Sequence, residues 1–363
     1  MARTGRARAV TLNAVLFLAS CLFSACVAEI LLRQLTVFPI HGYSNLRPHP
    51  LLSYTLSPHL RDVDPDGFRN PPGVGTRILA IGDSHTQGYN VKYEDSWPAR
   101  LAARIGEPVY DEGIGGYGVL QYGVLLATLP ADTREVLLGL YLANDFGYST
   151  APAMECITEA GRRAIEGAFD IPVPACPHAE PGADVWTAMR EHSAVCSAVS
   201  YAADRLRVHL TGRTRKTSVA IDGVPVRLEP HPRFTDRTNP PVAERVAFFL
   251  DLVRRFRELR PDVALEVLLI PSEEAVLHAA ELRCPRGAPT HLVLPELDLK
   301  EHLTQGLTAA GIPVQDALDA VVDHYCHDSD DARDHFYPLL DQHPLAEGQE
   351  AYAEAAFLLH QRR

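Results

Sequence analysis

The stretch Arg77-Ile78-Leu79-Ala80-Ile81-Gly82-Asp83-Ser84-His85 decides the fold class of this chain. Its apolar run ends in glycine, as is typical of a short strand that is buried on both faces. Residues 96–105 then show the pattern of a helix with a polar start, and residues 109–110 that of a second strand. Continuous apolar content in strands that alternate with helices indicates a parallel sheet covered on both faces. The chain is therefore predicted to be α/β, a three-layer α/β/α sandwich.

The same alternation continues toward the carboxyl terminus, with one long interruption. We expect the remaining helices at 119–129, 242–259, 297–310 and 347–360, and the remaining strands at 135–142, 264–270 and 313–314. Between about 147 and 241 the pattern loosens. That stretch holds a candidate helix at 184–210 and a hairpin signal at 219–226 with Asp-Gly at its turn. It is expected to be an insertion into the domain.

The amino terminus carries an apolar run from residue 9 to residue 28 that holds no charge. At 1.5 Å per residue the run spans about 30 Å, which is enough to cross a membrane once. Three arginines precede it and one acid follows it: Arg3, Arg6, Arg8 and Glu29. This charge distribution predicts that the short amino tail stays in the cytoplasm and that everything after about Arg33 lies outside, periplasmic or extracellular.

These features divide the chain into three expected parts. Residues 1–33 are expected to form an uncleaved signal anchor, residues 34–76 an extracytoplasmic linker, and residues 77–363 the globular domain. Two alternatives stay open for the first part. It could be a cleaved secretory peptide, or a lipoprotein signal cut at the box Leu18-Ala19-Ser20-Cys21. All three cases place the domain outside the cytoplasm.

The composition excludes several classes of protein. With 46% hydrophobic and 22% charged residues, the chain of 363 residues has ordinary globular usage rather than that of a disordered chain or a helical membrane bundle. Its 46 acidic residues against 34 basic ones give a net charge of −12. Because no basic footprint is present, no nucleic acid partner is expected.

Five cysteines follow the apolar run: Cys156, Cys176, Cys196, Cys284 and Cys326. Cysteines of an exported chain can form disulfides, but an odd number leaves at least one thiol over, and spacing does not give the connectivity. We expect Cys156 to pair with Cys176, because both lie in a stretch rich in proline and glycine. For the other three, bridged and unpaired states stay open.

Ser84 stands where the first predicted strand ends. The carboxyl ends of parallel strands open onto the ligand crevice, so a serine at this turn can present its hydroxyl as a nucleophile. Such a hydroxyl needs a histidine base and a carboxylate that orients the imidazole. Asp341-Gln342-His343-Pro344, just before the last predicted helix, supplies both.

An acyl transfer also needs donors for the oxyanion that develops. Gly113 follows the second predicted strand and lacks a Cβ, so that its backbone N–H could approach closely. Asn144 follows the third strand and offers a side-chain NH₂. The ends of three successive strands thus offer a nucleophile and two oxyanion donors, and one late turn offers a base with its carboxylate.

This set of residues resembles the four sequence blocks of the SGNH (GDSL-like) hydrolases, in particular bacterial, membrane-anchored members. The resemblance covers about residues 60–145 and 335–360 and includes a lead-in, Asp66-Gly67-Phe68-Arg69-Asn70. It implies a flavodoxin-like SGNH fold, with Ser84 as nucleophile and first oxyanion donor. Gly113 and Asn144 would complete the oxyanion hole, His343 would be the base, and Asp341 its partner.

The chain departs from the family pattern at several positions. His85 replaces the usual leucine of the first block, Asp111 a common asparagine and Leu142 a common glycine. Asp341 lies two residues before His343 rather than three. None of these departures removes a catalytic atom.

The expected activity is serine-dependent removal of an acyl group, in particular O-acetyl, from an extracytoplasmic carbohydrate or related ester. An O-acyltransferase acting on a sugar hydroxyl would use the same residues, and a non-catalytic glycan-binding protein is an alternative of another class.

No cofactor or metal is expected. Residues 113–118 match G-x-G-x-x-G but follow the second strand of the domain, where a dinucleotide-binding loop is not expected. No serine satisfies G-x-S-x-G, the signature of an α/β-hydrolase. The polar residues between His324 and His335 show no regular two-histidine spacing, so we expect a solvated loop rather than a metal site.

Overall fold

The computed structural model describes most of the chain. The described residues are 2–33, 46–58, 62–147, 156–175, 193, 195–196, 198–199, 202–203, 206, 217–221, 224–228, 235–284, 294–327, 336–337 and 342–362.

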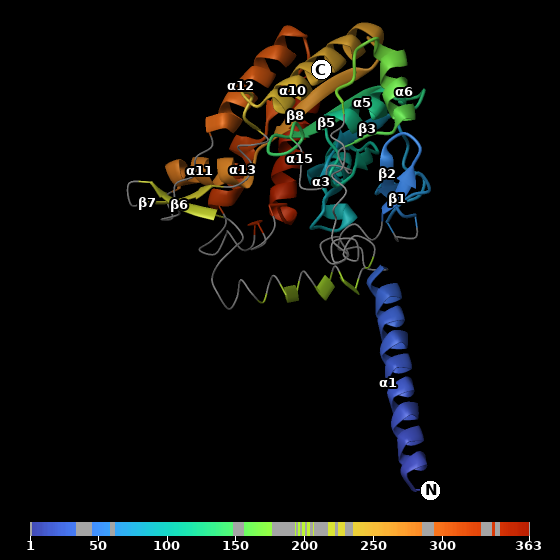
Figure 1. Cartoon of the computed structure of the whole chain (residues 1–363). Coiled ribbons are helices and arrows are strands. Elements are labelled where there is room, and N and C mark those ends of the chain that lie inside the picture. Colours follow the sequence, from blue (N-terminus) through green and yellow to red (C-terminus); the bar gives the residue numbers. More distant parts are fainter. Residues whose placement is uncertain are drawn as a thin grey trace.

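A five-stranded sheet lies at the centre of the domain (Figure 1). Its strands are β3 (Ile78–Gly82), β4 (Tyr110–Gly113), β5 (Glu135–Tyr141), β8 (Ala264–Ile270) and β9 (Val314–Asp316). They pair in the order β4-β3-β5-β8-β9, and every pair is parallel. Counted in chain order this is 2-1-3-4-5, the flavodoxin-like order. The predicted α/β fold class is confirmed.

Helices cover both faces of the sheet. One face carries α5 (Val119–Ala127), α6 (Glu159–Phe169), α10 (Pro240–Leu259) and α12 (Leu294–Ala309). The other face carries α4 (Trp97–Ile105), α11 (Glu273–Arg283), α13 (Leu318–His327) and α15 (Ala346–His360). Successive residues of β3 face opposite sides of the sheet, so that Leu79 and Ala80 are fully buried in opposite layers. This explains why the strands carry continuous apolar content.

Three of these helices were not expected from the sequence: α6, α11 and α13. Of the eleven residues of α6, only Gly161, Ile165 and Phe169 are buried. Three buried positions are too few to predict a helix from the sequence, because tertiary contacts supply most of the stability of short helices.

Residues 46–76, expected to be a linker, are packed onto the domain wherever they are described. β1 (Leu46–His49) and β2 (Ser53–Leu56) form an antiparallel hairpin. Tyr54, Leu56 and Phe68 are buried in the same core as α5 and α10. No sustained hydrophobic period is visible in these residues, because a four-residue strand followed by turns is too short to show one.

A disulfide joins Cys284 at the end of α11 to Cys326 in the last turn of α13, with 5.9 Å between the Cα atoms. The sequence left this pairing open. The predicted partner of Cys156 is Cys176, which lies outside the described residues, so that pairing stays a prediction.

The first helix, α1 (Ala2–Arg33), projects away from the domain (Figure 1). Its segment Leu12–Leu32 is long and apolar enough to span a membrane, and no part of that segment is buried. By length and composition this agrees with the predicted anchor, and a signal sequence would pass the same test.

Only parts of the predicted insertion are described. The hairpin appears as β6 (Thr217–Ile221) and β7 (Val224–Leu228), while its Asp222-Gly223 turn lies outside the described residues. Of the predicted helix at 184–210, the described residues from 195 to 206 are helical.

Candidate active site

The turn that carries Ser84 packs on a row of three glycines. Gly82, Gly113 and Gly139 are cross-strand neighbours on β3, β4 and β5. A Cβ at any of them would lie within 3 Å of an atom of Thr86 or Gln87, residues of the short helix α3 (Ser84–Gln87). Because these glycines have no side chain, α3 lies directly on the ends of three strands. This close packing fixes the height of Ser84 above the sheet edge.

Asp83 caps α3 and contacts the Ser84 hydroxyl. Its Oδ1 accepts a hydrogen bond from the His85 N–H at 2.8 Å, and its Oδ2 lies 3.2 Å from the Ser84 Oγ. Burial raises the pKa of Asp83 to about 6, although the N–H of His85 and the charge of His343 act to lower it. Ser84 itself is 5% exposed.

His343 meets Ser84 from the far end of the chain. Its Nε2 lies 2.6 Å from the Ser84 Oγ, across a separation of 259 residues. The Asn90 side-chain NH₂ donates to the His343 carbonyl oxygen at 2.9 Å. The imidazole also packs beside the ring of Tyr89, with centroids 4.7 Å apart. The two side chains that the sequence predicted as nucleophile and base thus lie within hydrogen-bond distance.

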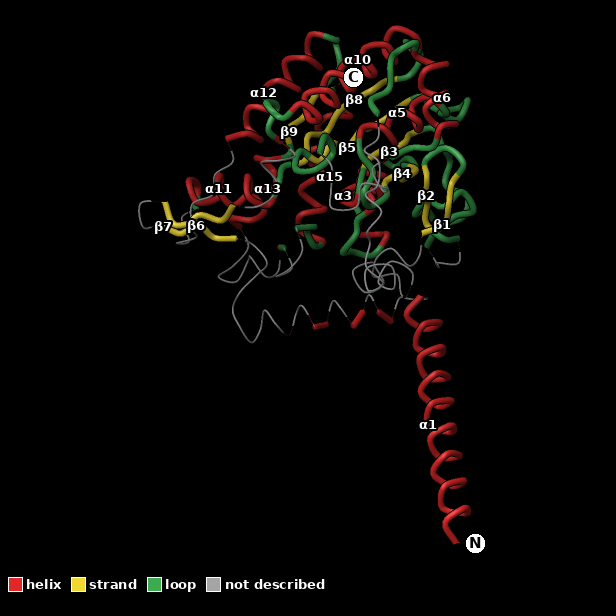
Figure 2. The backbone as a smooth tube through the Cα atoms, viewed as in Figure 1, coloured by secondary structure: helices red, strands yellow, loops and turns green. Residues whose placement is uncertain are grey.

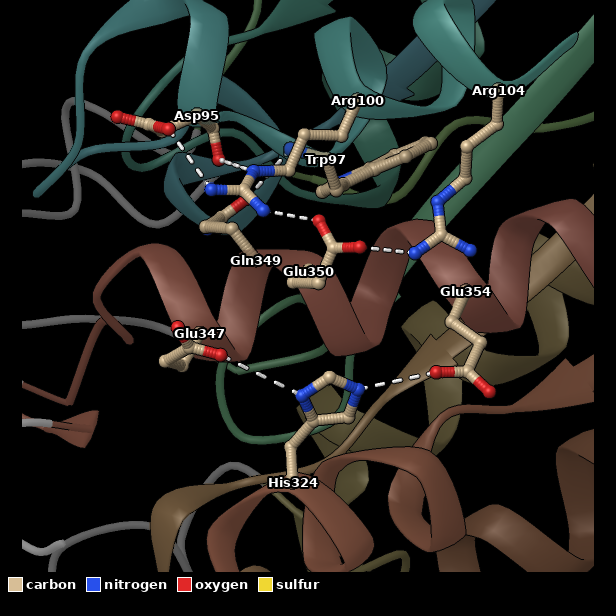
Figure 3. A network of polar contacts seen from close by, with 9 residues as sticks. All are labelled: Asp95, Trp97, Arg100, Arg104, His324, Glu347, Gln349, Glu350 and Glu354. Carbon is tan, nitrogen blue, oxygen red and sulfur yellow. Dashed lines mark hydrogen bonds and ion pairs between the residues drawn. The ribbon is translucent and has the colours of Figure 1, made fainter. Parts of the chain in front are cut away.

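The helix that follows His343, α15, is tied to the layer beneath the nucleophile. The Gln349 Oε1 accepts from the Trp97 N–H at 2.9 Å, and its Nε2 donates to the His85 carbonyl oxygen at 3.1 Å. Glu350 pairs with both Arg100 and Arg104 of α4, as Figure 3 shows. These contacts set where the chain enters α15, and hence where the preceding histidine lies.

Asp341, the predicted partner of His343, lies outside the described residues. Its role therefore stays a prediction.

The backbone N–H of Gly113 is already engaged. It donates to Asp111 Oδ1 at 2.7 Å, and Asp111 is fully buried. In this arrangement Gly113 supports the packing of α3 and is not a free donor for an oxyanion. The sequence assigned the donor to the first glycine of the turn because spacing alone does not show which N–H is already bonded.

The next glycine of this turn, Gly115, lies against Ser84. A Cβ on Gly115 would be 3.5 Å from the Ser84 Cβ, and the Gly115 N–H donates to Gln87 Oε1 at 2.7 Å. Gly116 has a φ of +84°, which an L side chain rarely adopts. Among the described residues, nothing accepts a hydrogen bond from the Gly116 N–H. Gly116 is therefore the better candidate donor.

Asn144 stands at the start of the loop after β5 and is half-buried. The neighbouring Asp145 carboxylate holds this loop, since it accepts from the Tyr141 N–H at 2.8 Å and from the Tyr122 hydroxyl at 2.9 Å. A Cβ on Gly118 would lie 2.9 Å from the Asp145 carbonyl oxygen, so the loops after β4 and β5 are in contact. The Asn144 Nδ2 has no acceptor among the described residues and is available as a donor.

The lead-in residues Arg69 and Asn70 hold two of the blocks in place. The fully buried Arg69 donates to the carbonyl oxygens of Gln87, Gly88 and Val91 at 3.0, 2.7 and 2.8 Å. Asn70 forms hydrogen bonds with both the N–H and the C=O of Asp111. The sequence pointed to this motif only through the family resemblance, and no local pattern shows that its side chains reach the Ser84 turn.

His85 lies next to the ring of His343. Its ring stacks on Tyr141 with centroids 3.8 Å apart, and its centroid is 4.9 Å from that of His343. Its Nδ1 is 3.3 Å from the Tyr352 hydroxyl of α15. The histidine that replaces the usual leucine is thus a buried packing residue with a polar contact.

The polar residues after His324 form no metal site within the part of the chain that the structure describes. His324 lies 3.1 Å from Glu354, Cys326 is in the disulfide, and His327 contacts the Asp323 carbonyl oxygen. Residues 328–335 lie outside the described ranges.

The comparisons with known proteins add solved structures of similar architecture. No family model matches the sequence, and no curated protein matches it. A putative lipolytic protein of the G-D-S-L family from Desulfitobacterium hafniense is 13% identical, with a TM-score of 0.39, over 78% of this chain and 99% of that one. Several such neighbours are GDSL-type proteins.

Two further neighbours have similar scores. An extracellular lipase from Streptomyces rimosus is 13% identical, with a TM-score of 0.37, over 79% of this chain and 99% of the lipase. A carbohydrate esterase family 2 enzyme from Corynascus thermopiles is 12% identical, with a TM-score of 0.36, over 80% of this chain and 66% of the enzyme. The neighbours thus include the family whose motifs the sequence resembles. Since these TM-scores lie below 0.5, the functional argument rests on the site itself.

Proposed function

We propose that this protein is a serine esterase in which Ser84 is the nucleophile and His343 the general base. The observation that carries the proposal is the 2.6 Å contact between the Ser84 Oγ and the His343 Nε2 at the carboxyl edge of a parallel sheet. A serine hydroxyl is a weak nucleophile unless a positioned base removes its proton. This contact is within the distance that such a transfer needs.

In the proposed reaction the Ser84 Oγ attacks the carbonyl carbon of an ester while its proton moves to His343. The oxyanion that forms would accept hydrogen bonds from the Ser84 N–H, the Gly116 N–H and the Asn144 Nδ2. His343 then gives the proton to the leaving alcohol, which leaves an acyl group on Ser84. Water, activated by the same histidine, releases the acid.

The carboxylate that orients His343 is proposed to be Asp341. In Ser-His-Asp sites this group holds the imidazole tautomer and stabilises the imidazolium that forms. Asp83 cannot be assigned this task from its contacts, because its oxygens lie against the Ser84 hydroxyl and the His85 N–H. Asp341→Asn should therefore lower kcat while leaving KM nearly unchanged.

The domain is proposed to lie outside the cytoplasm, tethered by α1. The arginines before the apolar segment favour this orientation. The Cys284–Cys326 disulfide is independent support, because such bonds persist mainly in oxidising compartments. An O-acetyl ester of an extracytoplasmic carbohydrate is the proposed substrate.

The test is hydrolysis of p-nitrophenyl acetate by the full chain and by Ser84→Ala. The wild type should release p-nitrophenol and the variant should not. If both chains are inactive on this ester and on acetylated glycans, yet bind the glycans, the protein is a binding module and the proposal fails.

A second measurement separates hydrolysis from transfer. The full chain is incubated with the ester and an unacetylated glycan, and both free acetate and acetylated glycan are followed. Acetate as the main product supports the esterase. Acetylated glycan as the main product would show that a sugar hydroxyl, rather than water, accepts the acyl group.

A further inference from the structure

A short helical segment lies beside the end of α1 and leaves apolar side chains exposed. Of its described residues, Val199 is 55% exposed and Leu206 57%, and Ala202 and Ala203 are exposed as well. Val199, Ala202 and Leu206 recur at intervals of three and four, so they share one face of a helix. Exposed apolar residues that gather on one face mark an interaction surface.

Two hydrogen bonds fix this segment to α1. The Glu29 Oε2 accepts from the Ser193 hydroxyl at 2.8 Å and from the Val195 N–H at 3.0 Å. Ser193 in turn accepts from the Cys196 N–H at 3.2 Å, as a residue at the start of a helix does. The carboxylate of Glu29 thus accepts hydrogen bonds from two groups at the start of the segment.

Glu29 also sets the height of the segment relative to a membrane. The apolar part of α1 runs from Leu12 to Leu32, so Glu29 lies in its last turn. If α1 spans the bilayer, this turn lies where the hydrocarbon gives way to lipid headgroups. Figures 1 and 2 show the described helical pieces near this end of α1 and running across its axis. A helix at this depth and in this direction lies parallel to the membrane surface.

We infer that the described helical residues between 195 and 206 lie in the interface of the membrane that α1 crosses, with Val199 and Leu206 facing the lipid. The inference rests on the proposed anchoring by α1. An amphipathic helix buries its apolar face between headgroups and acyl chains, and the apolar area buried there stabilises the position. The hydrogen bonds to Glu29 hold the start of this helical segment at the carboxyl end of the apolar part of α1, and this position identifies lipid as the partner.

The experiment measures quenching of tryptophan fluorescence by lipids with bromine on their acyl chains. The full chain is reconstituted into phosphatidylcholine vesicles as Val199→Trp and Leu206→Trp, and the signal of the native Trp97 and Trp186 is subtracted. Phe17→Trp, in the middle of α1, gives the response of a buried site. Leu282→Trp is the matched control, because Leu282 is 77% exposed on α11.

Both test positions should be quenched less than Phe17→Trp and clearly more than Leu282→Trp. Quenching no greater than at Leu282 overturns the inference, as does a blue-shifted emission without bromine quenching, which would mean that protein covers this face. If Phe17→Trp is also unquenched, α1 is not in the bilayer and the anchoring fails as well. Esterase activity of the same vesicles, assayed on soluble p-nitrophenyl acetate, reports separately on the catalytic proposal.

Discussion

The region around Ser84 and the region around His343 meet at one hydrogen bond, but different kinds of contact hold them. Ser84 begins a helix that lies on three glycines of three adjacent strands, and Arg69 binds the carbonyl oxygens that follow that helix. His343 lies near the start of the described segment 342–362, just before α15. Asn90 binds its backbone, and Gln349 ties the next helix to the domain.

This difference predicts how each region responds to change. Close packing places the serine, so substitutions beneath it must move backbone or open the core, and they should lower stability and activity together. His343 has ring contacts with Tyr89 and His85 and a backbone contact with Asn90, so loss of the Asn90 contact should lower activity with little loss of stability. Five experiments, from the largest expected effect to the smallest, test this contrast.

Removal of either reacting side chain should abolish most of the activity. Ser84→Ala or His343→Ala should each lower kcat by a factor on the order of 10⁴ to 10⁶, and the double variant should be little worse, because the two groups act as one unit. The measurement is ester hydrolysis, with melting temperature as control. Retention of most activity in His343→Ala would show that another residue is the base.

Asn144→Ala should lower kcat by roughly 10² to 10³, since one oxyanion donor contributes about 2.7–4 kcal/mol to transition-state stabilisation. Asn144→Asp should be at least as harmful, because it brings a negative charge to the oxyanion. Kinetics and thermal melts are measured together. An active Asn144→Asp, or a loss of melting temperature in proportion to activity in both variants, would make Asn144 a structural residue.

Gly139→Ala tests the packing beneath the serine. Its Cβ would lie 2.6 Å from the Thr86 Oγ1, so the Thr86 side chain or α3 itself must shift. Overpacking costs about 1–3 kcal/mol of stability, and a displacement of about 1 Å can lower the rate by about 10²-fold. Gly167→Ala in α6 is the matched control, since nothing lies within 4 Å of its Cβ. Equal behaviour of the two variants would contradict the close packing of α3 on the three glycines.

Asn90→Ala tests the support of the histidine. It removes the hydrogen bond to the His343 carbonyl oxygen, and one such bond contributes about 0.5–1.5 kcal/mol, so kcat should fall by at most about tenfold. KM should change little, and the melting temperature should fall by less than in Gly139→Ala. If stability falls as much as activity, the histidine region depends on packing after all, and the contrast between the regions disappears.

Asp83→Asn should have the smallest effect on the maximal rate and should move the pH dependence instead. Asp83 interacts electrostatically with His343, so removal of its charge should shift the acid limb of the kcat/KM profile to lower pH. The variant keeps an oxygen that can accept the His85 N–H. An unshifted acid limb would show that Asp83 does not influence the base.

The pH dependence of the stability also tests the role of Asp83. The pKa of Asp83 is about 6 in the folded protein, above its usual 3.8. Between about pH 4 and 6 the folded state therefore binds more protons than the unfolded state, and the free energy of unfolding should fall as the pH rises. Urea melts across this window should show a smaller decline in Asp83→Asn than in the wild type.

Much of the fold and part of the candidate site followed from the sequence. The apolar run that ends at Gly82 predicted the parallel sheet, and strand ends that share one edge predicted that Ser84 and the segment 113–118 would lie together. The pairing of Ser84 with His343 also followed, because Asp341-Gln342-His343 before the last predicted helix resembles the last sequence block of the SGNH hydrolases. These inferences succeed because they depend on local pattern and on the geometry of any parallel sheet.

The tertiary structure alone decided which groups are already bonded and which segments are packed. Gly113 was a plausible oxyanion donor until Asp111 was found to accept its N–H, and residues 46–76 were a plausible linker until Tyr54 and Phe68 were found in the core. The disulfide between Cys284 and Cys326 depends on two helices that the periodicity did not reveal. Hydrogen-bond occupancy, burial and disulfide pairing are properties of residues distant in sequence, so no local pattern of residues determines them.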